Sequence, residues 1–94
     1  MNTIIKIATR DNLIIKLTKE QWKHIIHRHP EMSNKLTEIE FTLKYPEYKI
    51  HYKNNIRKYY KYIKHENKYN MVVVKILNGD GFIITSYLTR KIEK

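Results

Sequence analysis

Three runs of β-branched and aromatic residues dominate the second half of the chain and most constrain its fold. They occupy residues 57–64 (RKYYKYIK), 69–77 (YNMVVVKIL) and 82–89 (FIITSYLT). Such runs favour extended strands. Asn78-Gly79, between the last two, is the dipeptide typical of a two-residue hairpin turn. With a shorter segment at 48–52, this half predicts an antiparallel meander of three or four strands.

The first half predicts two helices after a weak pair of strands at residues 3–8 and 12–17. Thr18 and Gln21 have the spacing of a capping box at a helix start. The apolar face of this helix repeats at helical spacing and comprises Trp22, Ile25, Ile26 and His29. Pro30 ends the helix near His29 and suits the first position of a second helix that runs to Pro46.

The expected fold is therefore α+β, with two N-terminal helices packed on an antiparallel sheet of about four strands. Ninety-four residues fit one domain, spanning residues 1–94. No apolar run is long enough for a membrane span, and the start has no signal-peptide pattern. The chain contains no cysteine, which excludes disulfides and thiolate chemistry. We expect a soluble, cytoplasmic protein.

The formal net charge is +10, with 19 lysines and arginines against nine acidic residues. A strongly basic surface is typical of proteins that bind a polyanion. Nucleic acid is therefore the expected partner.

The segment WKHIIHRHPE, residues 22–31, concentrates titratable side chains. His24, His27 and His29 have a spacing that invites a metal interpretation, but on a continuous helix His29 points away from the other two. No fourth ligand is evident. We therefore expect no metal and no cofactor, and His27 in particular fits a solvated surface position.

Metal-free acid–base chemistry fits the same segment better. His29 ends the apolar face, next to Arg28 and close to Glu31. Phosphodiester transfer needs a base, an acid and a cation that stabilises the charged transition state. A half-buried histidine with a structural role remains the alternative for His29, and a helix N-terminal carboxylate is the alternative for Glu31.

Alternation along the last strand places Phe82, Ile84, Ser86 and Leu88 on one face. If that face meets the helices, Thr85 and Tyr87 lie on the opposite side or the rim, where they can bind phosphate. Both residue types are also common in ordinary strands. The candidate catalytic residues are thus His24, Arg28, His29, Glu31, Thr85 and Tyr87.

Cations and aromatic rings alternate in residues 57–64, a pattern that suits phosphate contacts and base stacking. A strand edge guarded by lysines would look similar. The candidate RNA-binding residues are Arg57, Lys58, Tyr60, Lys61 and, on the next strand, Lys75.

Taken together, WKHIIHRHPE, YPEYKI, RKYYKY and the ending VVVKILNGDGFIITSYLTRKI resemble the small barnase–EndoU–colicin–RelE-like (BECR) ribonucleases, especially the phage-associated branch. The resemblance covers residues 17–92. It implies two helices on a four-stranded antiparallel sheet, and metal-independent RNA cleavage that leaves a 2′,3′-cyclic phosphate. His24 and residues 28–31 match the helical motif, and residues 85–87 match the terminal motif with serine in place of alanine. A terminal-strand histidine, the acid in barnase-like members, is absent here.

Three functions stay open at this point. The leading one is an RNA endonuclease, a toxin or phage-associated effector acting on tRNA or mRNA, which would need an inhibitor or antitoxin partner or some other restraint. The second is a non-catalytic, basic nucleic-acid-binding module. The third is a regulator that binds a protein partner through an exposed strand edge. Residues 48–52 offer such an edge, which a homodimer would also use.

Overall fold

Every strand of the chain belongs to one sheet in the computed structural model, which describes residues 2–93. The strands, in chain order, are β1 (Thr3–Ala8), β2 (Ile14–Thr18), β3 (Tyr48–Tyr52), β4 (Ile56–Ile63), β5 (Lys68–Leu77) and β6 (Asp80–Thr89). Their order across the sheet is β1-β2-β6-β5-β4-β3. All neighbours are antiparallel except β2 and β6, which run parallel.

The expectation of an antiparallel sheet of about four strands under two N-terminal helices is therefore wrong. The N-terminal strands form a hairpin that precedes the helices and extends the sheet, so that six strands make a mixed sheet. The extension depends on pairing between β2 and β6, where Ile15 lies opposite Gly81. These residues are far apart in the chain, and no local pattern in the sequence specifies their pairing.

Gly81 makes the close approach of β2 sterically feasible. A Cβ atom at this position would lie 2.8 Å from Cγ1 of Ile15 and 2.9 Å from Cγ1 of Val74. Such distances are too short for two carbon atoms. The absence of a side chain on β6 therefore leaves the space that Ile15 fills.

Two helices follow the hairpin, and the first begins where the sequence predicts. Helix α1 spans Lys19–Arg28, and the Thr18 hydroxyl caps it by accepting a hydrogen bond from the Gln21 backbone N–H at 3.1 Å. The Gln21 side chain does not complete a capping box. It donates instead to the carbonyl oxygen of Ile84 on β6, so it ties the helix to the sheet.

The second helix is shorter than expected. Pro30–Met32 form a single 3₁₀ turn (η1), and helix α2 spans Leu36–Lys44. The proline thus begins a turn and not the long helix, which starts six residues later. Within residues 2–93, no helix is long and apolar enough to cross a membrane.

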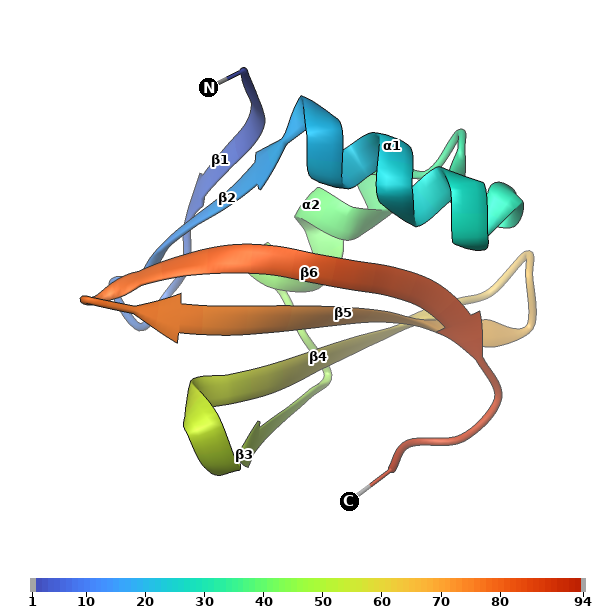
Figure 1. Ribbon diagram of the computed structural model, residues 1–94. Helices are drawn as coiled ribbons and strands as arrows, with labels where there is room; N and C mark the ends of the chain where they lie inside the picture. The colour runs from blue at the N-terminus through green and yellow to red at the C-terminus, as the bar shows by residue number, and fades with distance from the viewer. Residues whose placement is uncertain (1, 94) are drawn as a thin grey trace.

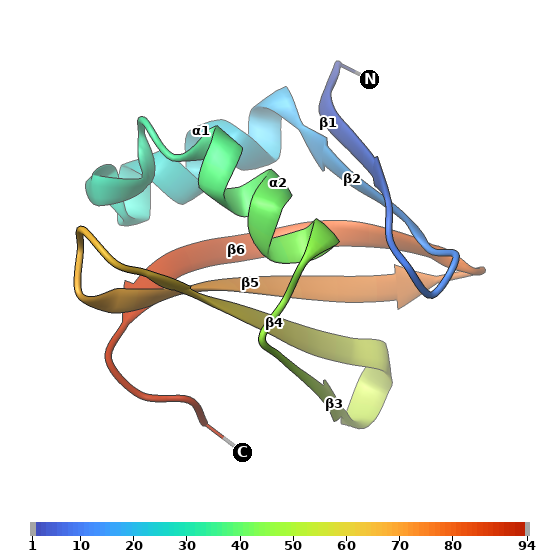
Figure 2. The same ribbon diagram turned by 180° about the vertical axis from the view of Figure 1, so that it is seen from behind.

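Both helices cover the same face of the sheet, and the C-terminal tail folds back across the other face (Figures 1 and 2). The core between helices and sheet is aliphatic, with one aromatic ring. Its fully buried members include Ile15, Leu17, Ile25, Met32, Ile39, Leu43, Tyr59, Val72 and Val74. Polar side chains of Thr42, Asn70 and Ser86 are buried among them, joined by hydrogen bonds of 3.0 Å on both sides of Asn70.

A β-bulge in β6 changes which side chains face the core. Val73 pairs with Thr85 but Val74 pairs with Ile83, so Ile84 is the extra residue. Ile83 is therefore 3% exposed and Ile84 37% exposed. The expected alternation, with Phe82 and Ile84 on the helix face, is wrong for this end of the strand because the bulge shifts it by one residue.

The hairpin between β5 and β6 is confirmed. Asn78 and Gly79 have φ angles of 53° and 84°, and Leu77 pairs with Asp80 on either side of them. Positive φ at both central residues is the geometry of a type I′ turn, which suits the natural twist of two antiparallel strands.

Candidate active site

The C-terminal half of α1 and the stretch of β6 that follows its bulge enclose a pocket of about 290 Å³. At this point β6 has passed the end of β2, which pairs only with residues 80–82, and α1 lies beside it (Figure 1). The residues that line the pocket are Gln21, His24, Arg28, His29, Ile84, Thr85 and Tyr87. The structure thus gathers five of the six candidate catalytic residues around one space.

His29 reaches this pocket because the chain leaves the helix at that residue. Its φ and ψ angles are −132° and 75°, and its backbone N–H still donates to the carbonyl oxygen of Ile25 at 2.7 Å. Pro30 disfavours helical geometry at the residue before it. The imidazole consequently lines the same pocket as His24, although the two would diverge on a continuous helix.

The His29 ring packs against Tyr87. Their centroids are 4.8 Å apart and their planes are inclined by 33°. Nδ1 of His29 also lies 3.9 Å from Oε2 of Glu31. The side chain of His29 is 31% exposed, so the imidazole contacts the Tyr87 ring, lies near a carboxylate and stays partly open to solvent.

Two further basic side chains line the solvent-exposed part of the pocket. His24 and Arg28 are exposed side chains one helical turn apart on α1. Glu31 contributes through His29 and does not line the pocket. A cation beside two imidazoles suits a ligand with negative charge, such as a phosphate.

Thr85 and Tyr87 are half-buried and face the pocket from β6, while Ser86 between them points into the core. The Ser86 hydroxyl lies 3.0 Å from Oδ1 of Asn70 and 2.7 Å from the carbonyl oxygen of Met71. It therefore has a structural role on the helix side of the sheet.

Within residues 2–93, no cluster of three or more histidine, cysteine or acidic side chains is placed to hold a metal ion. His27 is exposed and does not line the pocket. The three histidines of the motif are thus divided, with two at the pocket and one on the solvent side of α1.

The candidate RNA-binding residues do not form a common surface. Tyr60 is 0% exposed, and its hydroxyl accepts from the backbone N–H of Glu93 at 3.3 Å in the C-terminal tail. Its ring is therefore covered and does not offer a stacking surface. Lys58 lies 3.6 Å from the Glu93 carboxylate, and Lys61 lies over the ring of Phe41 at 5.3 Å.

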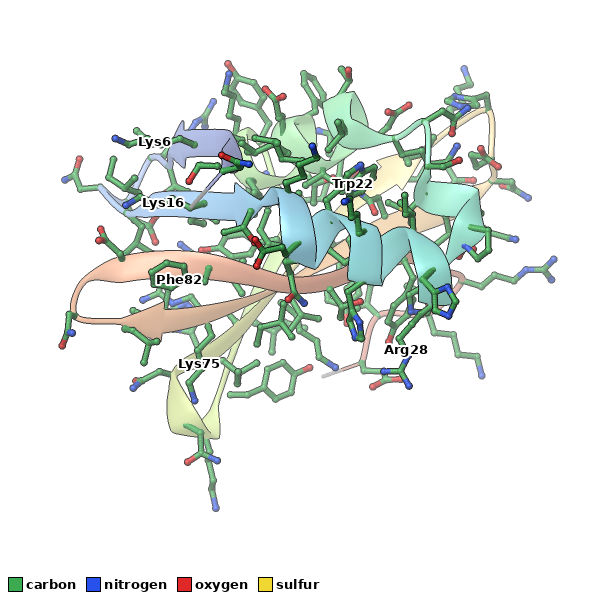
Figure 3. All side chains as sticks on the ribbon, turned by 45° about the horizontal axis from the view of Figure 1, so that its top comes forward. Lys6, Lys16, Trp22, Arg28, Lys75 and Phe82 are labelled. Carbon is green, nitrogen blue, oxygen red and sulfur yellow. The ribbon has the colours of Figure 1, made fainter. Side chains whose placement is uncertain are left out.

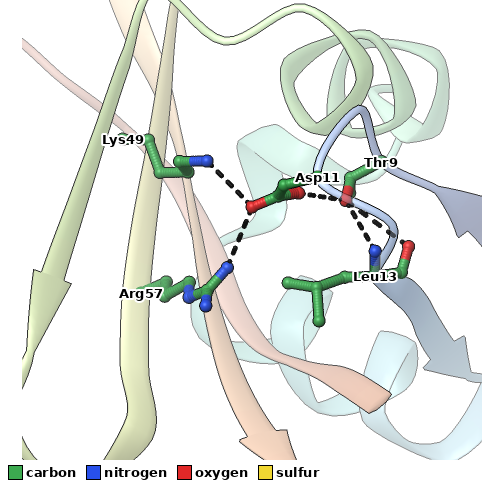
Figure 4. Close-up of polar contacts among 5 residues, drawn as sticks. All are labelled: Thr9, Asp11, Leu13, Lys49 and Arg57. Atoms are coloured by element: carbon green, nitrogen blue, oxygen red, sulfur yellow. Dashed lines mark hydrogen bonds and ion pairs between the residues drawn. The ribbon is translucent and has the colours of Figure 1, made fainter. Parts of the chain in front are cut away.

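Arg57 binds a carboxylate at the opposite end of the molecule from the pocket. Its Nη1 lies 3.1 Å from Oδ2 of Asp11, which Lys49 also contacts at 2.8 Å (Figure 4). Hydrogen bonds from Lys49 and Thr9 lower the pKa of Asp11 from 3.8 to about 2. The Arg57 guanidinium is thus engaged by a carboxylate within the protein, which it shares with Lys49.

Lys75 is the one member of that group that lies on the helix-free face in a row with other cations. It pairs with Phe82 on β6, which pairs with Lys16 on β2, which in turn pairs with Lys6 on β1. Sequence reasoning missed Lys6, Lys16 and Phe82, because their alignment depends on the parallel pairing of β2 with β6. It also missed the contact from Gln21 to β6, because the spacing of Gln21 from Thr18 was already explained by a capping box.

Comparisons of this chain with protein-family models, with curated proteins and with solved structures found no match. The functional assignment therefore depends on the geometry of the pocket and on the charge of the molecule.

Proposed function

We propose that this protein is a metal-independent RNA endonuclease acting on cytoplasmic RNA. The observation that carries the proposal is that one pocket is lined by His24, Arg28, His29, Thr85 and Tyr87 together. Two imidazoles in one pocket can supply a base and an acid for proton transfer. The guanidinium stabilises negative charge, and the net charge of +10 favours a polyanionic substrate.

Cleavage would proceed by attack of the ribose 2′-oxygen on the adjacent phosphorus. We assign His29 as the general base, because its ring packs against Tyr87 and the Glu31 carboxylate, 3.9 Å from its Nδ1, would stabilise the imidazolium that forms when it takes the 2′-hydroxyl proton. As the new P–O2′ bond forms, the P–O5′ bond breaks. His24, in its protonated form, would give its proton to the departing 5′-oxygen. The products are a 2′,3′-cyclic phosphate and a free 5′-hydroxyl.

The other pocket residues would hold the phosphate. Arg28 carries a permanent positive charge whose donors match phosphate oxygens. Thr85 and Tyr87 contribute hydroxyl donors from the rigid strand β6. Charge that develops on the non-bridging oxygens during attack is stabilised by donors fixed in advance.

The test is incubation of total RNA and one defined tRNA with the purified protein in excess chelator, with products resolved on a gel. We expect cleavage by the wild type and a loss of about 10²- to 10⁴-fold in rate for His29→Ala and His24→Ala. His51→Ala is the matched control, because His51 is an exposed histidine on the edge strand β3.

Two further readouts sharpen the result. The 3′ ends should carry a cyclic phosphate, and RNA methylated at the 2′-oxygen should resist cleavage, since it lacks the attacking hydroxyl. Intact RNA with and without added divalent metal would reject the proposal. Salt-dependent RNA binding without cleavage would then favour a binding module.

A further inference from the structure

The helix-free face of the sheet carries a row of cations that the proposed catalytic pocket does not use. Cross-strand pairing aligns Lys6, Lys16, Phe82 and Lys75 across β1, β2, β6 and β5. Figure 3 shows these four side chains one after another on neighbouring strands, with Arg28 at the far end of α1. We refer to them as the lysine row.

The row has a feature that folding alone does not favour. Lys6 and Lys16 are directly opposite each other on adjacent strands. Like charges in that position repel each other and destabilise the sheet. The ion pairs found among residues 2–93 involve neither of these lysines. An external anion would relieve the repulsion.

Phe82 gives the row an aromatic centre. Its ring is half-buried and lies between Lys16 on one side and Lys75 on the other. A partly exposed ring flanked by cations suits a nucleobase whose neighbouring phosphates meet the lysines.

The lysine row and the catalytic pocket share strand β6. Phe82 precedes the bulge and Thr85 follows it, so three residues at about 3.3 Å each place the two sites about 10 Å apart. Gln21, bound to Ile84 at the bulge, lies between them. A single RNA chain is therefore long enough to contact the lysine row and to reach the pocket at the same time.

We propose that the lysine row binds single-stranded RNA next to the cleavage site and guides it along β6 into the pocket. This inference rests on the proposed function for its substrate. It adds the N-terminal hairpin as part of the RNA-binding surface and Phe82 as a stacking residue. RNA is the occupant we favour because the face combines clustered positive charge with an aromatic ring.

Binding is measured with a single-stranded 2′-O-methyl oligoribonucleotide, which the proposed chemistry does not cut. The variant is the double substitution Lys6→Gln and Lys16→Gln. Its matched control is the double substitution Lys44→Gln and Lys64→Gln, which changes the net charge by the same amount. Both lysines are exposed; Lys44 ends α2 and Lys64 follows β4. Dissociation constants are determined over a range of salt concentrations.

We expect the Lys6/Lys16 variant to reduce the slope of log K against log salt by about 1.4, since each phosphate contact on a single strand contributes about 0.7. The control should leave the slope nearly unchanged. The melting temperature of the Lys6/Lys16 variant should stay the same or rise, because a repulsion is removed. Phe82→Leu should weaken binding about fivefold or more through the lost stacking.

With cleavable RNA, the Lys6/Lys16 variant should raise KM and leave kcat near the wild-type value. Equal slopes for variant and control would overturn the inference, as would undiminished binding by Phe82→Leu. Binding that depends on the row in a protein that cuts no RNA would support the row as an RNA-binding site and would reject the nuclease together with the guiding role. Normal cleavage that does not depend on the row would support the nuclease and reject the role of the lysine row.

Discussion

The imidazole of His29 and the phenol ring of Tyr87 pack with their centroids 4.8 Å apart, although one belongs to the end of α1 and the other to β6. The contact brings a titratable group and a hydroxyl into one pocket from two distant parts of the chain. It also limits the rotation of the imidazole. A fixed orientation helps a general base, because its nitrogen must face the group that gives up the proton.

Tyr87→Phe tests the hydroxyl separately from the ring. The ring contact with His29 is retained, so the melting temperature should change little. If the hydroxyl donates to the phosphate, the single-turnover cleavage rate should fall about 10²-fold. Tyr45→Phe, an exposed tyrosine at the end of α2, should cleave like the wild type. Full activity of Tyr87→Phe would remove this hydroxyl from the mechanism.

Gln21 is expected to position the two halves of the site, because its side chain donates to the Ile84 carbonyl oxygen at the bulge. Gln21→Leu should let α1 shift relative to β6 and lower kcat about tenfold or more, since small displacements of reacting groups have large effects on rate. The free energy of unfolding should fall by only about 1 kcal/mol. Lys23→Leu, on the exposed side of α1, is the control. Equal rates for both variants would contradict the positioning role.

Ser86 should matter for stability and not for cleavage. Ser86→Ala removes the buried hydroxyl whose single proton can be donated to Oδ1 of Asn70 or to the Met71 carbonyl oxygen, which should reduce the free energy of unfolding by about 1–3 kcal/mol in urea denaturation. Well below its melting temperature, the variant should cleave RNA at the wild-type rate. Ser33→Ala, an exposed serine after η1, should have little effect. A stable but inactive Ser86→Ala protein would place this hydroxyl in the mechanism instead.

The two glycines should respond differently to alanine. Gly81→Ala brings a Cβ within 2.8 Å of Ile15 and should reduce the free energy of unfolding by about 1–3 kcal/mol through overpacking. Amide exchange should then accelerate in β2, where the pairing with β6 is disturbed. An added Cβ at Gly79 would have no close neighbour, but the φ of this residue is 84°. Gly79→Ala should therefore lower the free energy of unfolding through backbone strain alone. Its effect on amide exchange should be confined to the β5–β6 turn. Unchanged exchange in β2 of Gly81→Ala would contradict the packing role.

The Asp11 cluster predicts a specific dependence of stability on pH. The folded-state pKa of Asp11 is about 2, below the ordinary value of 3.8, so its contribution is present above about pH 4 and is lost as the pH falls towards 2. Because the side chain is 35% exposed, solvent screening reduces the contribution to about 1 kcal/mol. Asp11→Asn should be less stable than the wild type at pH 7, and the difference should shrink as the pH falls from 4 towards 2.

Local patterns in the sequence were sufficient for most of the elements. The cap at Thr18, the hairpin at Asn78-Gly79 and the strand-forming runs after residue 56 each depend on neighbours within a few residues. Propensity and turn geometry act over that range. The same is true of His24, Arg28 and His29, which lie within six positions of one another and whose chemical types indicated a candidate site.

Only the tertiary structure decided how these parts meet. The parallel pairing of Ile15 with Gly81 makes the sheet six-stranded and mixed, and the bulge at Ile84 sets which face of β6 meets the pocket. The pairing results from packing between residues more than sixty positions apart. The bulge results from a single extra residue in the pairing of β6 with β5. The alternation of residue types along the sequence does not reveal where a bulge shifts the side chains from one face to the other. The sequence by itself therefore determined the elements and the candidate chemistry, whereas packing determined the sheet, the pocket and the lysine row.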